Sequence, residues 1–589
     1  MRILRLMVLA LIVGLASASF ALAQSTTDSP QAKSLHSLFD TTWKHQLAFY
    51  PHYASILGYR EWNSKWPDLT PANLKAHNEQ VLQFAKQLAA IDRAPLSAED
   101  QLNYDLFSRV LDEEQQSFKL HLYLIPLTQR EGIQTTDQLA DSIHFDTVQD
   151  YEDWITRLKT FPVYMDQTLA LLQAGLNEGI KHSKVTMERL PGQIDKQLVL
   201  PEQSGYYTPF RHFPNSIAIA DQQRLAAAGR EAISNSVLPA FRKMKQFFVA
   251  NYVPNCYDQV GIWQWPNGAE TYAYYAHRFT TTNLSPEQIH EIGLSEVKRI
   301  RGEMETLKTQ TGFKGSMAEF FTFLRTDPQF YYKTGDELLE ASRALAKRID
   351  PTLVRLFRKL PRTPYGVQPI PMLIAPDTTA AYYFWPAADG SRAGTLFVNV
   401  YKPETRPKWE MMALTLHEGV PGHHLQIALG QELTDVPEFR RFGNFTAFIE
   451  GWGLYSESLG DEVGLYDDPY SRFGMLTYQM WRAVRLVIDT GMHYKHWTRK
   501  QAIDYFMDNA ARNELDVTNE VDRYIAWPGQ ALAYKIGELK IRELRARATQ
   551  QLGPKFDVRE FHDVLLGSGA IPLDVLENKV NEWIAGKQK

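Results

Sequence analysis

The sequence predicts a mainly α-helical protein with one small β-sheet, and two observations support this fold class. Apolar residues recur at helical spacing, as in Leu82–Leu88, through long stretches of residues 35–250 and again through most of residues 402–545. In residues 369–402, by contrast, β-branched and aromatic residues are frequent, and Thr395–Val400 is typical of a strand. A small sheet is therefore expected between two helical parts of the chain.

The N-terminus has the pattern of a secretory signal peptide. Two arginines precede the apolar run Leu6–Leu15, and Ala21-Leu22-Ala23 supplies the small-x-small pattern that a signal peptidase reads. Residues 1–23 are predicted to be removed, which predicts a periplasmic or secreted protein. The apolar run is shorter than the roughly 20 residues of a membrane span, so no stable membrane insertion is expected after cleavage. Residues 24–589 are predicted to form a single helical domain.

The composition is that of a folded soluble protein and excludes some classes of function. Hydrophobic residues make up 44% of the chain and charged residues 22%, and the net charge is only −5. No basic block is present, so a nucleic-acid partner is not expected. Cys256 is the only cysteine, so no internal disulfide can form.

The segment from His417 to His424 reads H-E-G-V-P-G-H-H and is the strongest candidate for chemistry. A zinc-peptidase helix normally carries H-E-x-x-H, because histidines at positions i and i+4 share one face. Here Pro421 stands at i+4 and His423 at i+6, roughly 120° away from His417 on an unbroken helix. Because proline removes a helical hydrogen bond, we expect a kink or a two-residue bulge that returns His423 to the face of His417.

His424 is the rival for the position of second ligand. It lies at i+7 from His417 and is nearly in phase with it. Seven residues, however, are a rise of about 10.5 Å, which is a long reach for one zinc ion with ligand bonds of roughly 2.0–2.1 Å. The sequence therefore favours His423 as the ligand and places His424 beside it, in contact with the ligands.

A second segment places two carboxylates on one helix face. Glu450 and Glu457 lie seven residues apart in the sequence E-G-W-G-L-Y-S-E. Two histidines and a glutamate are a known ligand set for catalytic zinc, so Glu450 is predicted to be the third ligand. Glu457 is predicted to hydrogen-bond a ligand histidine and to fix its tautomer.

Together these motifs resemble those of the bacterial domain-of-unknown-function family 885. The later segments Asp489–His493 (D-T-G-M-H) and Pro528–Tyr534 (P-G-Q-A-L-A-Y) also resemble that family. The resemblance implies a zinc metallopeptidase similar to those of the thimet oligopeptidase and angiotensin-converting enzyme type. It also implies a large helical fold in two halves around a central cleft, with the small sheet beside the metal-binding helix.

The chemistry expected at such a site assigns roles to further residues. Glu418, next to a ligand, is expected to be the general base that takes a proton from water. The resembling peptidases supply an oxyanion donor from a later helix, and His493, Tyr524 and Tyr534 are the candidates here.

Substrate binding is expected to involve a strand and several cations. In the resembling peptidases an edge strand before the zinc helix pairs with the substrate, so Thr395–Val400 with Asn399 is predicted to line the substrate site. Arg485 and Arg523 are predicted to bind the substrate, since guanidinium groups bind terminal carboxylates well. Arg482 and Lys535 are weaker candidates, and for any single one of these cations an ordinary salt bridge is the alternative.

The predicted function is therefore zinc-dependent cleavage of short peptides. Two alternatives stay open. The same metal chemistry could act on a non-peptide amide or an ester, or the fold could serve a non-catalytic peptide-binding protein. Glu418 argues against the last alternative, because a binding protein does not need a base beside a metal ligand.

Overall fold

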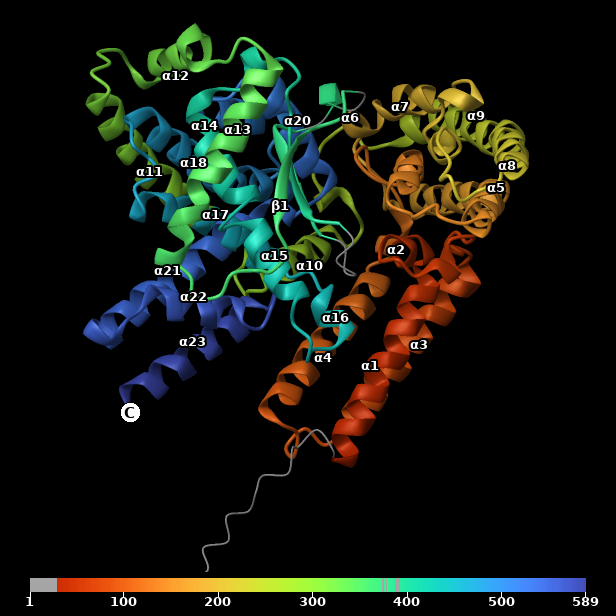
Figure 1. The fold of residues 1–589 in the computed structure, drawn as a ribbon, viewed down its shortest axis with the longest axis horizontal. Coiled ribbons are helices and arrows are strands. Elements are labelled where there is room, and N and C mark those ends of the chain that lie inside the picture. The colour runs from red at the N-terminus through yellow and green to blue at the C-terminus, as the bar shows by residue number, and fades with distance from the viewer. Residues whose placement is uncertain (1–28, 373–374, 378, 387–391) are drawn as a thin grey trace, which may run out of the picture.

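The computed structural model describes residues 29–372, 375–377, 379–386 and 392–589, and the predicted signal peptide lies outside these residues. The protein is mainly α-helical with one small sheet, as predicted (Figure 1). The α-helices that precede the sheet are α1 (Pro30–Phe49), α2 (Pro51–Ile56), α3 (Pro71–Ala89), α4 (Ala98–Lys119), α5 (Val148–Glu178), α6 (Lys184–Met187), α7 (Leu190–Gln197), α8 (Ile219–Ala232), α9 (Leu238–Phe247), α10 (Gly268–Thr280), α11 (Pro286–Gln310), α12 (Met317–Thr326) and α13 (Gly335–Ile349). Those that follow it are α14 (Lys408–Glu418), α15 (His423–Gln431), α16 (Glu438–Arg441), α17 (Thr446–Glu462), α18 (Pro469–His493), α19 (Arg499–Asn509), α20 (Glu514–Ala526), α21 (Ala533–Leu552), α22 (Val558–Leu566) and α23 (Leu573–Gln588).

Several helices begin at a residue whose side chain accepts a hydrogen bond from a free backbone amide of the first turn. The Thr147 hydroxyl accepts from the amide of Asp150 at the start of α5, and the Asp150 carboxylate accepts from the Thr147 amide in return. Ser285 and Gln288 form the same reciprocal cap on α11, with Pro286 in its first turn. Such caps satisfy amides that have no partner within the helix.

The hydrophobic residues gather into separate clusters along the chain. Helices α1, α3 and α4 share a cluster that includes Leu35, Phe84 and Phe107. A second cluster holds α5 and α7 to α9 together, and Figure 1 shows these helices grouped on one side of the molecule. The largest cluster belongs almost wholly to residues 260–584, so the C-terminal half has a core of its own.

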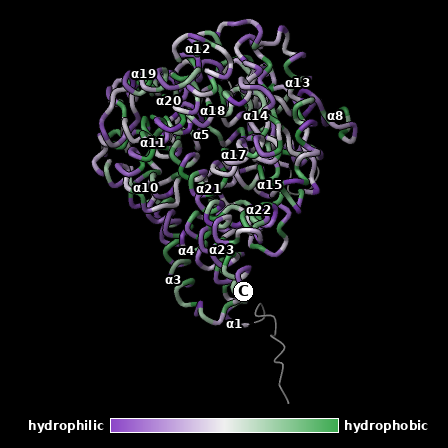
Figure 2. The backbone as a smooth tube through the Cα atoms, turned by 90° about the vertical axis from the view of Figure 1, so that its left-hand side faces the viewer, coloured by the Kyte–Doolittle hydropathy of each residue, from purple (hydrophilic) through white to green (hydrophobic). Residues whose placement is uncertain are grey.

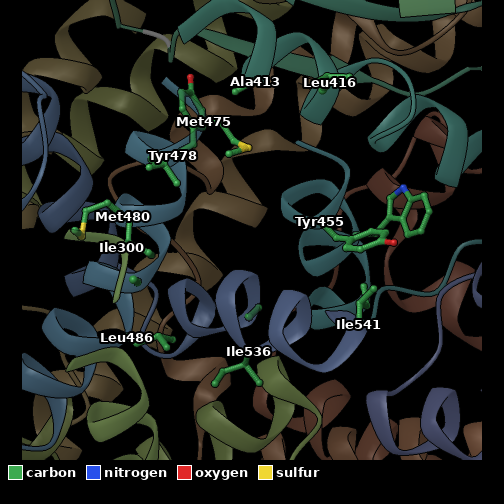
Figure 3. Packing of buried hydrophobic residues seen from close by; sticks show 14 of the residues in the cluster. Ile300, Ala413, Leu416, Tyr455, Met475, Tyr478, Met480, Leu486, Ile536 and Ile541 are labelled. Atoms are coloured by element: carbon green, nitrogen blue, oxygen red, sulfur yellow. The ribbon is translucent and has the colours of Figure 1, made fainter. Parts of the chain in front are cut away.

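Helices α11, α14, α17, α18 and α21 pack around this largest core (Figure 3). Leu416 of α14, Tyr455 of α17 and Ile536 of α21 are all at most 4% exposed. Helices α17 and α21 approach closely where Gly451 faces Gly537, since an added Cβ at position 537 would lie 1.9 Å from the Ala447 carbonyl oxygen. This packing fixes α17, which carries Glu450 and Glu457 of the predicted site, against α21.

The sheet has three strands, β1 (Tyr365–Pro369), β2 (Ala381–Phe384) and β3 (Gly394–Val398), in the order β1-β3-β2. Strand β3 pairs in parallel with β1 and antiparallel with β2. The predicted strand Thr395–Val400 corresponds to β3 at Gly394–Val398, but β3 is the central strand, and both of its edges are already paired. Its predicted role as a free edge that pairs with a peptide is therefore wrong.

Among the described residues, no helix is long and apolar enough to cross a membrane. Figure 2 shows hydrophobic and hydrophilic residues interleaved along the chain. This is the pattern of helices that bury one face and leave the other polar.

Candidate metal centre

The segment between His417 and His423 is a break between two helices. Helix α14 ends at Glu418 and α15 begins at His423, and the Gly422 amide donates to the Leu416 carbonyl (2.9 Å). An added Cβ on Gly422 would lie 1.9 Å from the His417 carbonyl oxygen, so only glycine fits there. The predicted two-residue bulge within one helix is therefore wrong. The break between two helices nevertheless brings His423 close to His417, as the bulge was expected to do.

Helix α17 holds this break in place from the other side. The indole nitrogen of Trp452 donates to the Pro421 carbonyl (2.8 Å), and the Ser456 hydroxyl donates to the Leu416 carbonyl (3.1 Å). Both donors lie on the helix that carries Glu450. The position of the second histidine is thus tied to the helix of the predicted third ligand.

His417, His423 and Glu450 converge on one point. The Nε2 atoms of His417 and His423 lie 3.6 and 3.5 Å from Oε2 of Glu450. The three donor atoms lie within 4.8 Å of one another, and the imidazole planes are nearly perpendicular, at 86°. His417 is 2% exposed and His423 9% exposed, so the group is largely closed to solvent.

The spacing of these donors fits a zinc ion better than hydrogen bonds. A hydrogen bond between an imidazole N–H and a carboxylate is normally about 2.7–3.2 Å long. Two ligand bonds of about 2.0–2.1 Å at a tetrahedral angle separate their donor atoms by about 3.3 Å, close to the 3.5 and 3.6 Å found here. Two imidazoles and one carboxylate are also a donor set that zinc accepts.

The carboxylates around His417 favour a positive charge at this point. Burial alone would lower the pKa of His417, but the carboxylates of Glu450, 3.6 Å away, and of Glu457, which accepts from Nδ1, outweigh it and raise the pKa to about 9. Burial would raise the pKa of Glu450, whereas His417 and His423 hold it well below its usual value. A bound cation would satisfy the same carboxylates.

Glu457 holds the imidazole of His417 from behind. Its Oε1 accepts from Nδ1 of His417 at 2.8 Å, so Nε2 is the nitrogen that faces Glu450. Glu457 is fully buried, with Arg482 at 3.9 Å. This is the contact predicted for Glu457, and it fixes the tautomer that a metal ligand requires.

Glu418 is half-buried at the end of α14. It follows His417 directly in the chain, and its negative charge contributes to the raised pKa of His417. Within the described part of the chain it has no hydrogen-bond or ion-pair partner. The carboxylate is therefore free to bind water.

His424 points away from the three donor atoms and toward the sheet. Its Nδ1 is 2.8 Å from the hydroxyl of Tyr383 on β2, and its ring packs on Tyr365 of β1 at 4.7 Å. Burial lowers its pKa to about 4. His424 thus joins α15 to the sheet and makes no recorded contact with the other two histidines or Glu450, contrary to its predicted place beside them.

His493 and Tyr524 are core residues whose polar atoms are occupied. Nδ1 of His493 accepts from the Ile262 amide (3.2 Å), and its Nε2 donates to the Tyr524 carbonyl (3.0 Å). The Tyr524 hydroxyl donates to Glu520 (2.7 Å) and accepts from Arg485 (2.7 Å). The structure therefore gives neither residue a free group for the predicted catalytic role.

Tyr534 is the one predicted oxyanion donor that lies near the three donor atoms. Tyr534 lies one turn before Gly537, which packs against Gly451, the residue after Glu450. Burial and then the charge of Glu450 raise the pKa of Tyr534. Its side chain is half-buried, and its hydroxyl has only a long contact, 3.4 Å, to Nε2 of Gln530. Among the described residues, its hydroxyl therefore makes no short hydrogen bond.

The predicted substrate-binding residues differ in what they touch. Asn399 is fully buried, and its amide donates to the Ala375 and Thr379 carbonyls, so it holds the chain beside β3 and does not face a substrate. Arg485 and Arg523 both pair with Glu520, at 3.1 and 2.9 Å. Lys535 pairs with Glu538 (2.7 Å) in the core.

Comparison with known proteins places the chain in a family. The sequence pattern of the family described as "Bacterial protein of unknown function (DUF885)" matches residues 51–580. The chain belongs to this family. No match was found among curated proteins.

Two solved structures share the family fold. The "putative lipoprotein" from Colwellia psychrerythraea is 30% identical, with a TM-score of 0.88 over 95% of this chain and 99% of that one. A "putative lipoprotein of unknown function" from Shewanella oneidensis is 16% identical, with a TM-score of 0.70 over 93% and 99% of the two chains, which shows a shared fold only. Neither description nor that of the family names a peptidase, so the resemblance to metallopeptidases stays a prediction.

Sequence reasoning missed a glycine that makes room for His417. An added Cβ on Gly453 would lie 2.8 Å from Cε1 and 2.9 Å from Nε2 of His417. Gly453 lies on α17 between Glu450 and Glu457, which both contact that imidazole. The signal was in the sequence, since the E-G-W-G-L-Y-S-E motif of this DUF885 protein has a glycine on the helix face between its two glutamates.

Asp489 is a buried carboxylate that anchors the turn before Tyr534. Burial raises its pKa to about 7, against hydrogen bonds from the Tyr272 hydroxyl (2.7 Å) and the Gly529 amide (3.1 Å) and against the charge of Arg523. An aspartate in an unfolded chain has a pKa of about 3.9. Between about pH 4 and 7 the folded protein therefore binds one more proton than the unfolded chain, and this group makes the protein less stable as pH rises.

We expect the Asp489→Asn variant to gain stability relative to the wild type as pH rises from 4 to 7, by more than about 1 kcal/mol. Asparagine cannot ionise, so the variant does not lose stability at this position as pH rises, whereas the wild type does. Urea unfolding at several pH values measures the difference. The exposed Asp40, which has no ion pair in the described structure, provides the control Asp40→Asn. A difference for Asp489→Asn that stays constant with pH would contradict the prediction.

Proposed function

We propose that this DUF885 protein is a zinc-dependent hydrolase that cleaves the peptide bonds of short peptides in the periplasm or outside the cell. The observation that carries the proposal is the convergence of His417, His423 and Glu450 beside a partnerless Glu418. The descriptions of the two solved relatives as "putative lipoprotein" support a place in the cell envelope or beyond it.

The proposed roles follow from the contacts of each side chain. Zinc, held by two histidines and a glutamate, supplies Lewis-acid activation of water and of the scissile carbonyl. Glu418 takes the proton of the attacking water and passes it to the leaving amine. The Tyr534 hydroxyl donates to the carbonyl oxygen as negative charge develops on it. Glu457 accepts from Nδ1 of His417, which leaves Nε2 as the nitrogen that would lose its proton and bind the metal.

Zinc content and cleavage of a mixed peptide library test the proposal. The wild type should bind about one zinc ion per chain and cleave peptides, and a chelator should abolish cleavage until zinc is restored. The proposal is contradicted if the wild type binds no zinc, or if it cleaves peptides equally well after the metal has been removed.

Replacing His423 should have a much larger effect on zinc binding than replacing His424. His423→Ala removes a donor that lies 3.5 Å from Glu450, so we expect zinc affinity to fall by more than about 100-fold. His424→Ala breaks only the contact with Tyr383 and should keep zinc. Competition titration with a chromophoric chelator measures both affinities. Equal losses in the two variants would contradict the assignment of His423.

A further inference from the structure

A turn from the N-terminal half docks on α20. Residues 128–131 form the turn, closed by the Thr128 amide and the Glu131 carbonyl (2.8 Å). The side-chain amide of Gln129 donates to the carbonyl of Asp522 on α20 (2.8 Å), and both groups are buried. This contact holds the turn that carries Arg130 against the part of α20 that carries Arg523.

Arg130 is a cation without a counter-ion. Its side chain is exposed and lies over the Trp527 ring, with its guanidinium carbon 5.8 Å from the ring centroid. Within the described part of the chain its guanidinium makes no hydrogen bond or ion pair. Partial desolvation by neighbouring groups and then the charge of Arg523 lower the pKa of this exposed side chain, and Glu520 and Tyr534 are also near enough to act on it.

The acidic groups nearby are committed to other partners. Glu520 pairs with Arg485 and Arg523 together and accepts from Tyr524. Asp489 accepts from Tyr272 and Gly529. Glu131, next to Arg130, interacts with the Trp527 side chain, and no ion pair forms between the two neighbours.

Arg523 and Arg485 connect this turn to Tyr534 through a series of contacts. The guanidinium of Arg523 donates to Oε1 of Gln530 (2.7 Å), and Nε2 of Gln530 contacts the Tyr534 hydroxyl (3.4 Å). The guanidinium of Arg485 lies 4.2 Å from the centroid of the Tyr534 ring, and its Nη1 is buried with no hydrogen-bond partner in the described structure. Arg523 and Arg485 share the single carboxylate of Glu520 and therefore leave a net positive charge beside Tyr534.

We propose that Arg130 binds the free C-terminal carboxylate of a bound peptide, with Arg523 and Arg485 adding positive potential behind it. A planar guanidinium matches a carboxylate with two parallel hydrogen bonds, and Arg130 is the cation of this row that no acidic group engages. This inference rests on the proposed function. It makes the protein a peptidase that prefers substrates with a free C-terminus, and Arg130 the residue that sets this preference.

Kinetics with three probe peptides test the role of Arg130. The probes are tetra-alanine with a free carboxylate, its C-terminal amide, and an acetylated, amidated peptide Ala-Ala-Glu-Ala whose only carboxylate is on the glutamate. Arg130→Gln should lower kcat/KM for the free acid by about 10- to 100-fold, as expected for loss of a charged hydrogen bond, and leave the slower cleavage of the amide unchanged. Arg130→Lys keeps the charge but cannot form two parallel hydrogen bonds to a carboxylate. Its kcat/KM for the free acid should lie between those of the wild type and Arg130→Gln.

The control is Arg242→Gln, which removes an exposed arginine of the same half that has no ion pair in the described structure. It should keep the wild-type preference for the free acid. Equal losses on acid and amide, or no loss at all, would overturn the proposal. Loss confined to the glutamate peptide would overturn the assignment to the main-chain carboxylate and point to an acidic side chain.

A binding measurement separates this inference from the proposed function. Calorimetric titration of the Glu418→Gln protein with tetra-alanine and with its amide should show tighter binding of the free acid, and Arg130→Gln in the same background should abolish the difference. If the wild type hydrolyses none of the peptides but this difference is found, the proposed function fails and the carboxylate site stands. If the two probes bind equally, the carboxylate site fails whatever the wild type cleaves.

Discussion

Replacing Glu418 with glutamine should abolish most peptide cleavage and leave zinc binding intact. Glutamine has the shape of glutamate but cannot take a proton from water, and a positioned base contributes about 10²- to 10⁴-fold to such a rate. Glu418 is not one of the three converging side chains, so its loss removes no donor atom. We expect kcat to fall by about that factor, with the zinc content of the purified protein unchanged.

Glu404→Gln is the matched control for this variant. Glu404 is exposed, lies shortly before α14, and has no ion pair within the described structure. It should have wild-type activity. If Glu418→Gln keeps the wild-type kcat, Glu418 is not the base. If it loses zinc and activity together, Glu418 acts by holding the metal and the proposed role is wrong.

The convergence of the three side chains was predictable because the information is local. His417 and His423 lie in one short segment, and Glu450 and Glu457 in another, so chemistry and spacing alone group them. The path of the backbone was not predictable in the same way. Pro421 and Gly422 predict that a regular helix is interrupted there. They do not determine whether the interruption is a bulge within one helix or a break between two helices. The structure has the break.

The roles assigned to His493, Tyr524 and Asn399 failed for a common physical reason. Each polar side chain is satisfied by backbone or side-chain groups that packing brings to it, such as the Ile262 amide against His493 or the Ala375 carbonyl against Asn399. A sequence shows the polar atom and not its partner. Buried polar groups are nearly always hydrogen-bonded, so a histidine or tyrosine in a motif-like segment is as easily structural as catalytic.

The strand order and the position of Arg130 could not be predicted from the sequence, because both depend on contacts between residues far apart in the chain. Thr395–Val400 has the composition of a strand, but only its pairing with both β1 and β2 makes it central. Arg130 is separated from Arg523 by most of the chain, and the hydrogen bond from Gln129 to Asp522 that brings them together spans 393 residues. No local pattern marks such a contact.

Gly453→Ala should weaken zinc binding although alanine is the better helix former. The added Cβ would lie 2.8 Å from Cε1 and 2.9 Å from Nε2 of His417, and that imidazole cannot yield freely because its Nδ1 is held by Glu457 at 2.8 Å. Either the ring turns away from Glu450 or the bond to Glu457 breaks. We expect zinc affinity to fall by about 10- to 100-fold, the usual cost of disturbing the groups that orient a metal ligand.

Gly302→Ala separates this steric effect from helix propensity. Gly302 is an exposed position of α11 where an added Cβ meets nothing within 4 Å. That change should raise the free energy of unfolding by about 0.5–1 kcal/mol and leave zinc affinity unchanged. Gly453→Ala should instead lower the stability of the metal-free protein by about 1–3 kcal/mol, as overpacking does. If both alanines stabilise the protein and both variants bind zinc as the wild type does, the contact between α17 and the His417 ring does not constrain the site.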